Sequence, residues 1–143
     1  MKGVVIIMNT FHARIYESDN TFYTGELENL VIPIFDGEYG VQAGHRNEVV
    51  AIVPGVLRYR EAGGSDRYAA VSEGMMRIEN GDVLVLVNSA EHPEEIDENR
   101  AELAKEEARE KMLQKKSMQE YVLAEASLQR AMSRLKVKRG TKQ

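Results

Sequence analysis

One change of composition, close to residue 88, constrains the fold of this chain more than any other feature. Before it, short segments rich in Val, Ile, Leu, Tyr and Thr alternate with turn signals about every ten residues, as in β-sandwiches and barrels. After it, no glycine occurs until Gly140, and the helix formers Ala, Glu, Lys, Leu, Met and Arg dominate. The sequence therefore predicts an α+β protein with a β domain over residues 1–88 and a helical domain over residues 89–143.

The first domain is predicted to be an antiparallel β-sandwich. Its predicted strands are residues 4–8, 22–33, 48–53, 56–60, 68–71, 75–78 and 83–87. Turn residues separate them, and the Asn-Gly pair at 80–81 favours a tight hairpin because both residues tolerate positive φ. Residues 83–87 form a continuous apolar run. Such a run predicts a strand that is buried on both faces, between two sheets.

Glycines recur through residues 37–45, between two of the predicted strands. Tight turns that only glycine can form explain this spacing, and we interpret the segment as a loop. The alternative is a partner surface built around Glu38 and His45, because loops on a rigid scaffold often carry function.

Two helices joined by a tight turn are predicted in the second domain. Pro93 suits a first helical turn, and Asp97 is a second candidate for the N-cap. Ser117 and Glu120 match the capping box that begins a new helix. Residues at helical spacing give each helix an alanine-rich apolar stripe: Ala101, Ala104, Ala108 and Met112, then Ala124, Leu128, Ala131 and Leu135. This pattern predicts a C-terminal two-helix antiparallel hairpin.

The two predicted helices carry opposite charge. Residues 89–110 contain nine acidic and three basic side chains, whereas residues 111–143 contain nine basic and two acidic ones. Exposed ion pairs contribute only ~0.2–1 kcal/mol each, and alanine buries little area. We therefore expect a hairpin of marginal stability that is able to open.

Composition excludes several classes of function. A formal net charge of −4 and a sequence pI of about 5.5 disfavour a nucleic-acid partner. The absence of cysteine removes disulfides, thiolate zinc sites and cysteine nucleophiles. The apolar run at 4–8 is too short for a signal peptide or for the ~20 residues that span a bilayer. We expect any link to a membrane to come through a partner.

No motif for catalysis is found. The chain has neither a P-loop nor a G-x-G-x-x-G fingerprint. The three histidines, His12, His45 and His92, are not spaced as metal ligands. The sequence also lacks a G-x-S-x-G elbow whose serine a histidine could activate. We expect no catalytic residue and no metal site.

A different arrangement favours anion binding. Carboxylates and an arginine lie between Glu91 and Arg100, and Arg130 and Arg134 follow at i and i+4, on one face of the second helix. Two such arginines can bind phosphate oxygens in fork geometry. A solvated basic face explains the same spacing, so spacing alone leaves both interpretations open.

Six motifs in fixed order point to a known family. They are Tyr-Thr-Gly-Glu at 23–26, the glycines and Gly-His of 37–45, Pro-Gly-Val-Leu at 54–57, Val-Ser-x-Gly at 71–74, Asn-Ser-Ala-Glu at 88–91, and Ile-Asp-x-x-Arg-Ala at 96–101. In this order and spacing, the chain resembles the epsilon subunit of bacterial F-type ATP synthase over nearly its whole length. Ala43, residues 46–47 and Glu73 depart from the family pattern, which usually has Pro, Ala-Pro and Gly at these positions.

The resemblance implies a non-catalytic rotor subunit that needs no cofactor. Its sandwich would dock on the gamma subunit and on the membrane rotor ring subunits, with Glu38 and His45 as contact residues. Its hairpin would inhibit ATP hydrolysis by extending along gamma to the catalytic alpha/beta head. The resemblance also implies a monomer when isolated, and a peripheral location on the cytoplasmic face of the inner membrane as part of the complex.

Some bacterial members bind ATP as a regulatory ligand in the folded hairpin. The residues that match this site are Glu91, Ile96, Asp97, Arg100, Ala101, Arg130 and Arg134. One arginine that is frequent in the family's first helix corresponds to Glu107, whose carboxylate opposes phosphate. The motif also occurs in members that bind ATP weakly or not at all, so the sequence leaves ATP binding open.

Two other classes of function compete. The first is a small-ligand or carbohydrate-binding β-sandwich with a helical dimerisation arm, but 6% aromatic residues and no Trp disfavour sugar stacking. The second is an enzyme that uses His45, for which the sequence offers no matched nucleophile or acid.

Overall fold

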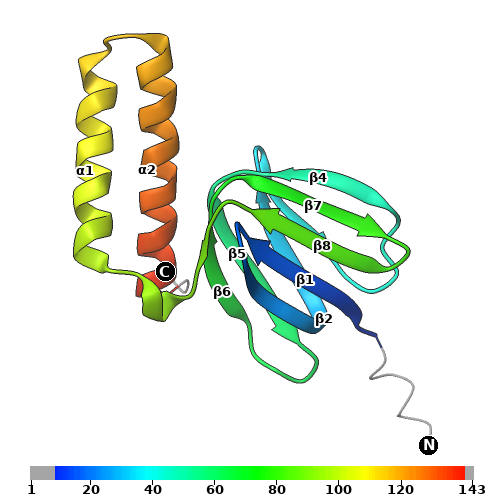
Figure 1. Cartoon of the computed structure of the whole chain (residues 1–143). Helices are drawn as coiled ribbons and strands as arrows, with labels where there is room; N and C mark the ends of the chain where they lie inside the picture. Colours follow the sequence, from blue (N-terminus) through cyan, green and yellow to red (C-terminus); the bar gives the residue numbers. More distant parts are fainter. Residues whose placement is uncertain (1–8, 141–143) are drawn as a thin grey trace, which may run out of the picture.

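The computed structural model describes residues 9–140, as a β domain followed by two long helices (Figure 1). The strands are β1 (Phe11–Glu17), β2 (Asn20–Ile34), β3 (Gly37–Val41), β4 (Glu48–Ile52), β5 (Gly55–Glu61), β6 (Arg67–Val71), β7 (Gly74–Glu79), β8 (Asp82–Val87) and β9 (Ala90–Glu91). The helical elements are η2 (Pro93–Glu95), α1 (Glu98–Gln114) and α2 (Met118–Arg139). The predicted fold class, a β-sandwich followed by a helical hairpin, is confirmed.

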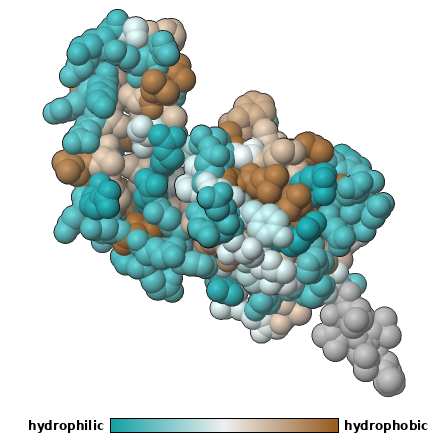
Figure 2. Space-filling model, viewed as in Figure 1, coloured by the Kyte–Doolittle hydropathy of each residue, from teal (hydrophilic) through white to brown (hydrophobic). Residues whose placement is uncertain are grey.

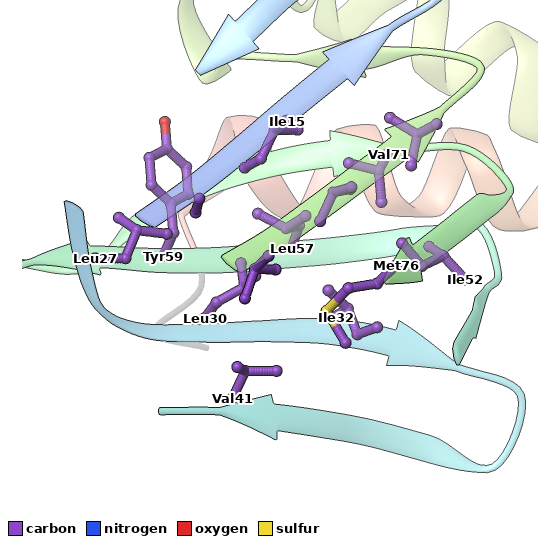
Figure 3. Packing of buried hydrophobic residues seen from close by; sticks show 14 of the residues in the cluster. Ile15, Leu27, Leu30, Ile32, Val41, Ile52, Leu57, Tyr59, Val71 and Met76 are labelled. Carbon is purple, nitrogen blue, oxygen red and sulfur yellow. The ribbon is translucent and has the colours of Figure 1, made fainter. Parts of the chain in front are cut away.

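The strands are linked in the order β4-β7-β8-β1-β2-β5-β6-β9, and β3 pairs with β2. The 15-residue strand β2 connects the two halves, because it pairs with β1 as well as with β3 and β5. One pair, β1 with β8, is parallel, and the other pairs are antiparallel. The strands curve around one core, in which Ile15, Leu27, Leu30, Ile32 and Leu57 are completely buried (Figure 3).

Most of the predicted strands coincide with observed ones, but β1, β3 and the two-residue β9, which lies in the predicted helical domain, were not predicted. In β1, buried Phe11, Ala13 and Ile15 alternate with half-buried polar residues, which is the signature of a strand with one covered face. β3 occupies the first half of the segment that was interpreted as a loop, and only the part beyond Val41 lacks strand structure. The predicted strand at 4–8 lies outside the described residues.

The prediction that strand 83–87 is buried on both faces is wrong. In β8, Val83, Val85 and Val87 face the core, whereas Leu86 is 41% exposed and Leu84 is half-buried. β8 lies between β7 and β1 in a single layer, and no second layer within the described residues covers its outer face. The apolar residues on that face are therefore available to solvent or to a partner.

The two helices form the predicted antiparallel hairpin, with α2 against the β domain and α1 on the far side (Figure 1). Both candidate helix starts are used. Glu95 accepts a hydrogen bond from the backbone N–H of His92 and closes the short η2 turn, and Asp97 then caps α1. Ser117 caps α2 by accepting a hydrogen bond from the backbone N–H of Glu120.

Alanines allow the two helices to approach each other. The buried residues of the hairpin include Ala101, Ala108, Ala124, Ala131 and Leu135, which are members of the two predicted apolar stripes. Within residues 9–140, no helix is long and apolar enough to cross a membrane.

Candidate functional site

The candidate anion site is a hollow at the base of the hairpin, where η2 and the start of α1 meet α2. Its volume is about 210 Å³. The lining residues are Glu91, Glu95, Ile96, Asp97, Arg100, Ala101, Ala104 and Arg134. The tertiary structure therefore brings together all of the nucleotide-site residues predicted from sequence except Arg130.

Arg130 lies one turn before Arg134 on α2 and faces the β domain. It lines a narrow crevice beside the hollow, together with Ser72, Ser89 and Glu91. Arg134 and Glu91 line both spaces, so they form the wall between the hollow and the crevice. A ligand in the hollow therefore meets Arg134 first, and Arg130 only beyond it.

Three of the predicted residues shape the hollow through the backbone and through packing. Asp97 accepts hydrogen bonds from the backbone N–H groups of Asn99, at 3.0 Å, and Arg100, at 3.2 Å, and so fixes the start of α1. Ile96 is buried against the β domain, and Ala101 is buried between the helices. These contacts hold the hollow in place whether or not it contains a ligand.

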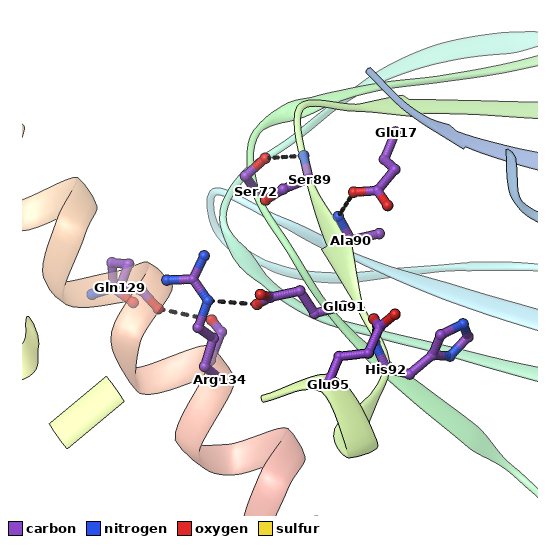
Figure 4. Close-up of polar contacts among 10 residues, drawn as sticks. Glu17, Ser72, Ser89, Ala90, Glu91, His92, Glu95, Gln129 and Arg134 are labelled. Atoms are coloured by element: carbon purple, nitrogen blue, oxygen red, sulfur yellow. Dashed lines mark hydrogen bonds and ion pairs between the residues drawn. The ribbon is translucent and has the colours of Figure 1, made fainter. Parts of the chain in front are cut away.

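The charged groups of the hollow are already paired, except for one. The Arg134 Nε donates to Glu91 Oε1 at 2.5 Å, and both side chains are about one-third exposed (Figure 4). Glu95 and Asp97 serve as caps. Among the described residues, Arg100 has no ion-pair partner within 4.0 Å and is exposed at the rim. An anion in the hollow therefore has Arg100 available at once, but competes with Glu91 for Arg134.

A second cluster of ion pairs lies next to the hollow and joins the two ends of the hairpin. Arg139, at the end of α2, donates to Glu98 Oε2 at 2.7 Å and to Glu102 Oε2 at 2.5 Å. The hydrogen bond from Arg139 lowers the pKa of the Glu102 carboxyl group, and the nearby positive charges act in the same direction. These pairs stabilise the contact between the start of α1 and the end of α2.

Glu107 does not line the anion hollow. It lines a second space of about 410 Å³ further along the hairpin, with Lys111, Lys116 and Glu120. The two spaces have only Ala104 in common. Lys111 and Lys116 line the same space as Glu107, and the predicted opposition of Glu107 to phosphate stays a prediction.

Sequence reasoning did not identify Glu95, Ala104 or Glu73 as part of this region. The spacing of His92 and Glu95, which is that of a capping pair, is a signal that identifies Glu95. Ala104 belongs to the predicted apolar stripe, but nothing in the sequence places it at a hollow. Glu73 approaches α2 only through the folding of the sheet, so no local pattern identifies it.

The predicted partner-contact residues lie on and after β3. Glu38 is exposed on the strand, and His45 is half-buried in the following loop. His45 lines a shallow hollow with Gly40, Gln42 and Gly44, to which Glu38 does not contribute. The structure therefore places the two residues on neighbouring surfaces and not in one pocket.

Hydrogen bonds fix the His45 loop on its strands. His45 Nε2 lies 3.1 Å from the Tyr39 hydroxyl, which donates to Glu48 Oε1 at 2.5 Å. The hydrogen bond to the Glu48 carboxylate raises the pKa of Tyr39. His45 Nδ1 lies 2.9 Å from the carbonyl oxygen of Arg46. His45 is therefore held by its neighbours, whereas Glu38 is available for contact.

Within residues 9–140, no group of three or more His, Cys, Asp or Glu side chains is arranged to hold a metal ion.

Comparisons with known proteins agree along the whole described chain. Residues 10–93 match the family model for the ATP synthase delta/epsilon chain beta-sandwich domain, and residues 94–139 match the model for the delta/epsilon chain long alpha-helix domain. An ATP synthase epsilon chain of Ruminiclostridium cellulolyticum is 41% identical over 90% of this chain and 95% of its own length. One of Caldanaerobacter subterraneus is 38% identical over 90% of this chain and 93% of its own length.

Solved structures give the same result. A chain in the Euglena gracilis mitochondrial ATP synthase, solved as OSCP/F1/c-ring, matches with a TM-score of 0.78 and 26% identity, over 87% of this chain and 79% of that one. A chain of the central stalk and c-ring of the Tetrahymena thermophila enzyme matches with a TM-score of 0.63, over 89% of this chain and 95% of that one. Its identity is 10%, so it supports the fold alone.

Proposed function

The chain belongs to the ATP synthase delta/epsilon chain family, and on this premise we propose that it is a non-catalytic rotor subunit of the central stalk of a bacterial ATP synthase. The observation that carries the proposal is the match of both family domains in order, supported by a structural neighbour within an F1/c-ring assembly. The family membership favours this function over the carbohydrate-binding and enzymatic alternatives.

We propose that the outer face of the sheet binds the gamma subunit. Strand register places eight side chains there in two rows, Val49, Arg77, Leu84 and Arg14, then Ala51, Met75, Leu86 and Tyr16. Val49 is 62% exposed, and Met75 and Leu86 are about 40% exposed. A sheet face that stays in water is normally polar. This face is mostly apolar, and in Figure 2 hydrophobic side chains are exposed on the upper part of the β domain.

We further propose that the β3 segment contacts the rotor ring subunits. Glu38 is exposed, and the side chain of Arg46 is 81% exposed beside the fixed His45. Contact with the ring places the subunit at the cytoplasmic face of the inner membrane, where it is peripheral and held by the complex.

The helical hairpin is the proposed regulatory element, which inhibits ATP hydrolysis when it leaves the β domain and extends along gamma. Its contact with the β domain is made by α2 and η2. ATP bound in the hollow stabilises the folded hairpin by RT ln(1 + [L]/Kd), or ~1.4 kcal/mol for each tenfold excess over Kd. That amount shifts a nearly balanced equilibrium, so high ATP keeps the hairpin folded and the motor free.

Copurification with gamma tests the stalk role. The wild-type chain is expected to copurify with the gamma subunit, and Met75→Glu together with Leu86→Glu is expected to abolish this. Leu103→Glu is the matched control, because Leu103 is 60% exposed on α1, away from the sheet. Equal recovery of gamma with all three chains would rule out the proposed surface.

Calorimetric titration with ATP tests the sensing role separately. Arg100→Ala is expected to remove a saturable heat of binding, because Arg100 is the hollow's unpaired cation. Arg109→Ala, on the same helix but outside the hollow, is expected to bind ATP like the wild type. A wild-type chain that gives no heat would remove ATP sensing and leave the stalk role intact.

A further inference from the structure

Two arginines one turn apart on α2 reach two carboxylates of the β domain. Arg134 pairs with Glu91 of β9 at 2.5 Å. Arg130 Nη1 lies 3.9 Å from Glu73 Oε1, and its Nη2 donates to the Ser127 hydroxyl at 3.1 Å. The arginines that suggested a phosphate site therefore face anions that the chain itself supplies.

Glu73 is held in position for this contact. It lies in the short connection between β6 and β7, next to residue Asn88. The Asn88 Nδ2 donates to Glu73 Oε2 at 2.9 Å, and the Asn88 backbone N–H donates to the Glu73 carbonyl at 3.1 Å. With one carboxylate oxygen fixed by Asn88, the other is directed toward Arg130.

The apolar part of the contact between α2 and the β domain is small. It consists of buried Ala70, Ile96 and Val137, with Val56 and Tyr68 half-buried around them. A cluster of this size buries little area, and the hydrophobic contribution scales with area. The ion pairs beside it add to this small apolar contact, by ~0.2–1 kcal/mol each for partly exposed pairs.

We propose that Glu73 and Glu91 form an acidic clasp, which holds the folded hairpin on the β domain through Arg130 and Arg134 without a bound anion. Glu73 is a positioning residue in this clasp, since it acts on the hairpin through Arg130. The inference rests on the proposed mobility of the hairpin but not on nucleotide binding. On this proposal, a phosphate ligand competes with the clasp carboxylates for the two arginines instead of filling an empty site. Salt screens the ion pairs, so docking of the hairpin on the β domain weakens as the salt concentration rises.

Cysteine labelling measures how often the hairpin leaves the β domain, because the natural chain contains no cysteine. Ala70 is 5% exposed and lies under α2, so Ala70→Cys reacts when the hairpin undocks. The neighbouring Ala69 is fully buried in the core of the β domain, so Ala69→Cys reacts only when that domain unfolds. The pair separates undocking from unfolding in the full chain.

Glu73→Gln keeps the shape of the side chain and removes its charge. We expect it to speed labelling at position 70 about 1.5- to 5-fold at low salt, the range for a partly exposed ion pair, and to leave labelling at position 69 unchanged. Glu79→Gln is the matched control, because Glu79 is exposed on β7 and pairs with Arg77, away from α2. The difference between Glu73→Gln and wild type is expected to shrink in high salt.

Labelling at position 70 that is the same in Glu73→Gln as in wild type would overturn the clasp and leave hairpin mobility standing. Wild-type labelling at position 70 as slow as at position 69 would show that the hairpin does not undock by itself, and would overturn both. If ATP does not bind, the labelling rates at positions 69 and 70 are unaffected. The clasp proposal and the ATP-sensing proposal can therefore fail independently.

Discussion

At the scale of single residues, Arg134 belongs both to an ion pair and to the wall of the candidate anion hollow. Its guanidinium pairs with Glu91 and also lines the candidate anion hollow. A phosphate that took the Arg134 Nε would have to displace the Glu91 carboxylate, so it would gain less from this arginine than from an unpaired one. Arg100 has no such competitor, and for this reason it is the better residue for testing the hollow.

Gly74 is a residue at which a single methyl group is not tolerated. A Cβ at this position would lie 1.9 Å from the Leu86 carbonyl oxygen and 2.7 Å from the Val87 Cα, both on the paired strand β8. We expect Gly74→Ala to destabilise the β domain by about 1–3 kcal/mol or more, because backbone atoms must move. Gly40→Ala meets nothing within 4 Å and is the control. Urea unfolding of both variants measures the effect, and equal midpoints would contradict it.

We expect the Glu102 carboxyl group to make the hairpin sensitive to acid. Its pKa is lowered by the hydrogen bond from Arg139, so its contribution to stability is present above the pKa of the unfolded chain and is lost as pH falls through the lower folded value. The melting temperature of the helices, measured by circular dichroism, is expected to fall as the pH is lowered. We expect Glu102→Gln to make this fall less steep. Glu106→Gln, exposed on the same helix, is expected to keep the wild-type steepness. An unchanged steepness in Glu102→Gln would refute the assignment.

At the scale of elements, the caps determine where the helices begin. Ser117 caps α2 far from the hollow, whereas Asp97 caps α1 inside it. Each cap contributes about 0.5–2 kcal/mol. We expect Ser117→Ala and Asp97→Ala to lower hairpin stability by similar amounts, and Asp97→Asn to restore it because Asn also accepts the hydrogen bonds. Thermal melts of the three variants test this expectation. An Asp97→Ala variant with the melting temperature of the wild type would mean that the Asp97 cap is dispensable.

The strand β8 illustrates how an element depends on its layer. Its five apolar residues are compatible with burial on both faces of the strand. In the structure only one of the two faces is covered. The second face becomes part of the proposed gamma-binding surface. A continuous apolar run in a sheet of this kind therefore indicates either a central strand or a strand that becomes buried on assembly.

At the scale of the whole molecule, the positive charge of α2 has a role in the folded hairpin and in its proposed extended state. In the folded state the basic α2 faces Glu73, Glu91, Glu98 and Glu102. In the proposed extended state the same helix meets the catalytic head, and its net positive charge favours an acidic surface there. On this proposal, extension of the hairpin replaces the carboxylates of its own chain with carboxylates of the catalytic head.

Neutralising exposed charge on α2 tests this second encounter. We expect Lys136→Gln with Lys138→Gln to weaken inhibition of ATP hydrolysis by the assembled enzyme several-fold. Lys105→Gln with Lys111→Gln removes the same charge from α1 and is expected to leave inhibition nearly unchanged. Undiminished inhibition would exclude a role for this charge.

The sequence by itself determined the division into β and helical parts, both helix caps and most strand positions. These features depend on residues a few places apart, such as Ser117 and Glu120, so local propensity and capping decide them. Four of the candidate site residues, Ile96, Asp97, Arg100 and Ala101, were also found from the sequence, through a family motif of short spacing at 96–101.

Only the tertiary structure decided which apolar face is covered and which charges meet. The parallel pairing of β1 with β8 joins residues about seventy places apart, such as Ala13 and Val83, and local pattern carries no record of it. For the same reason the sequence left open whether Arg130 and Arg134 face solvent or an anion. Burial and ion pairing are set by neighbours that folding brings from distant parts of the chain, and here those neighbours are Glu73 and Glu91.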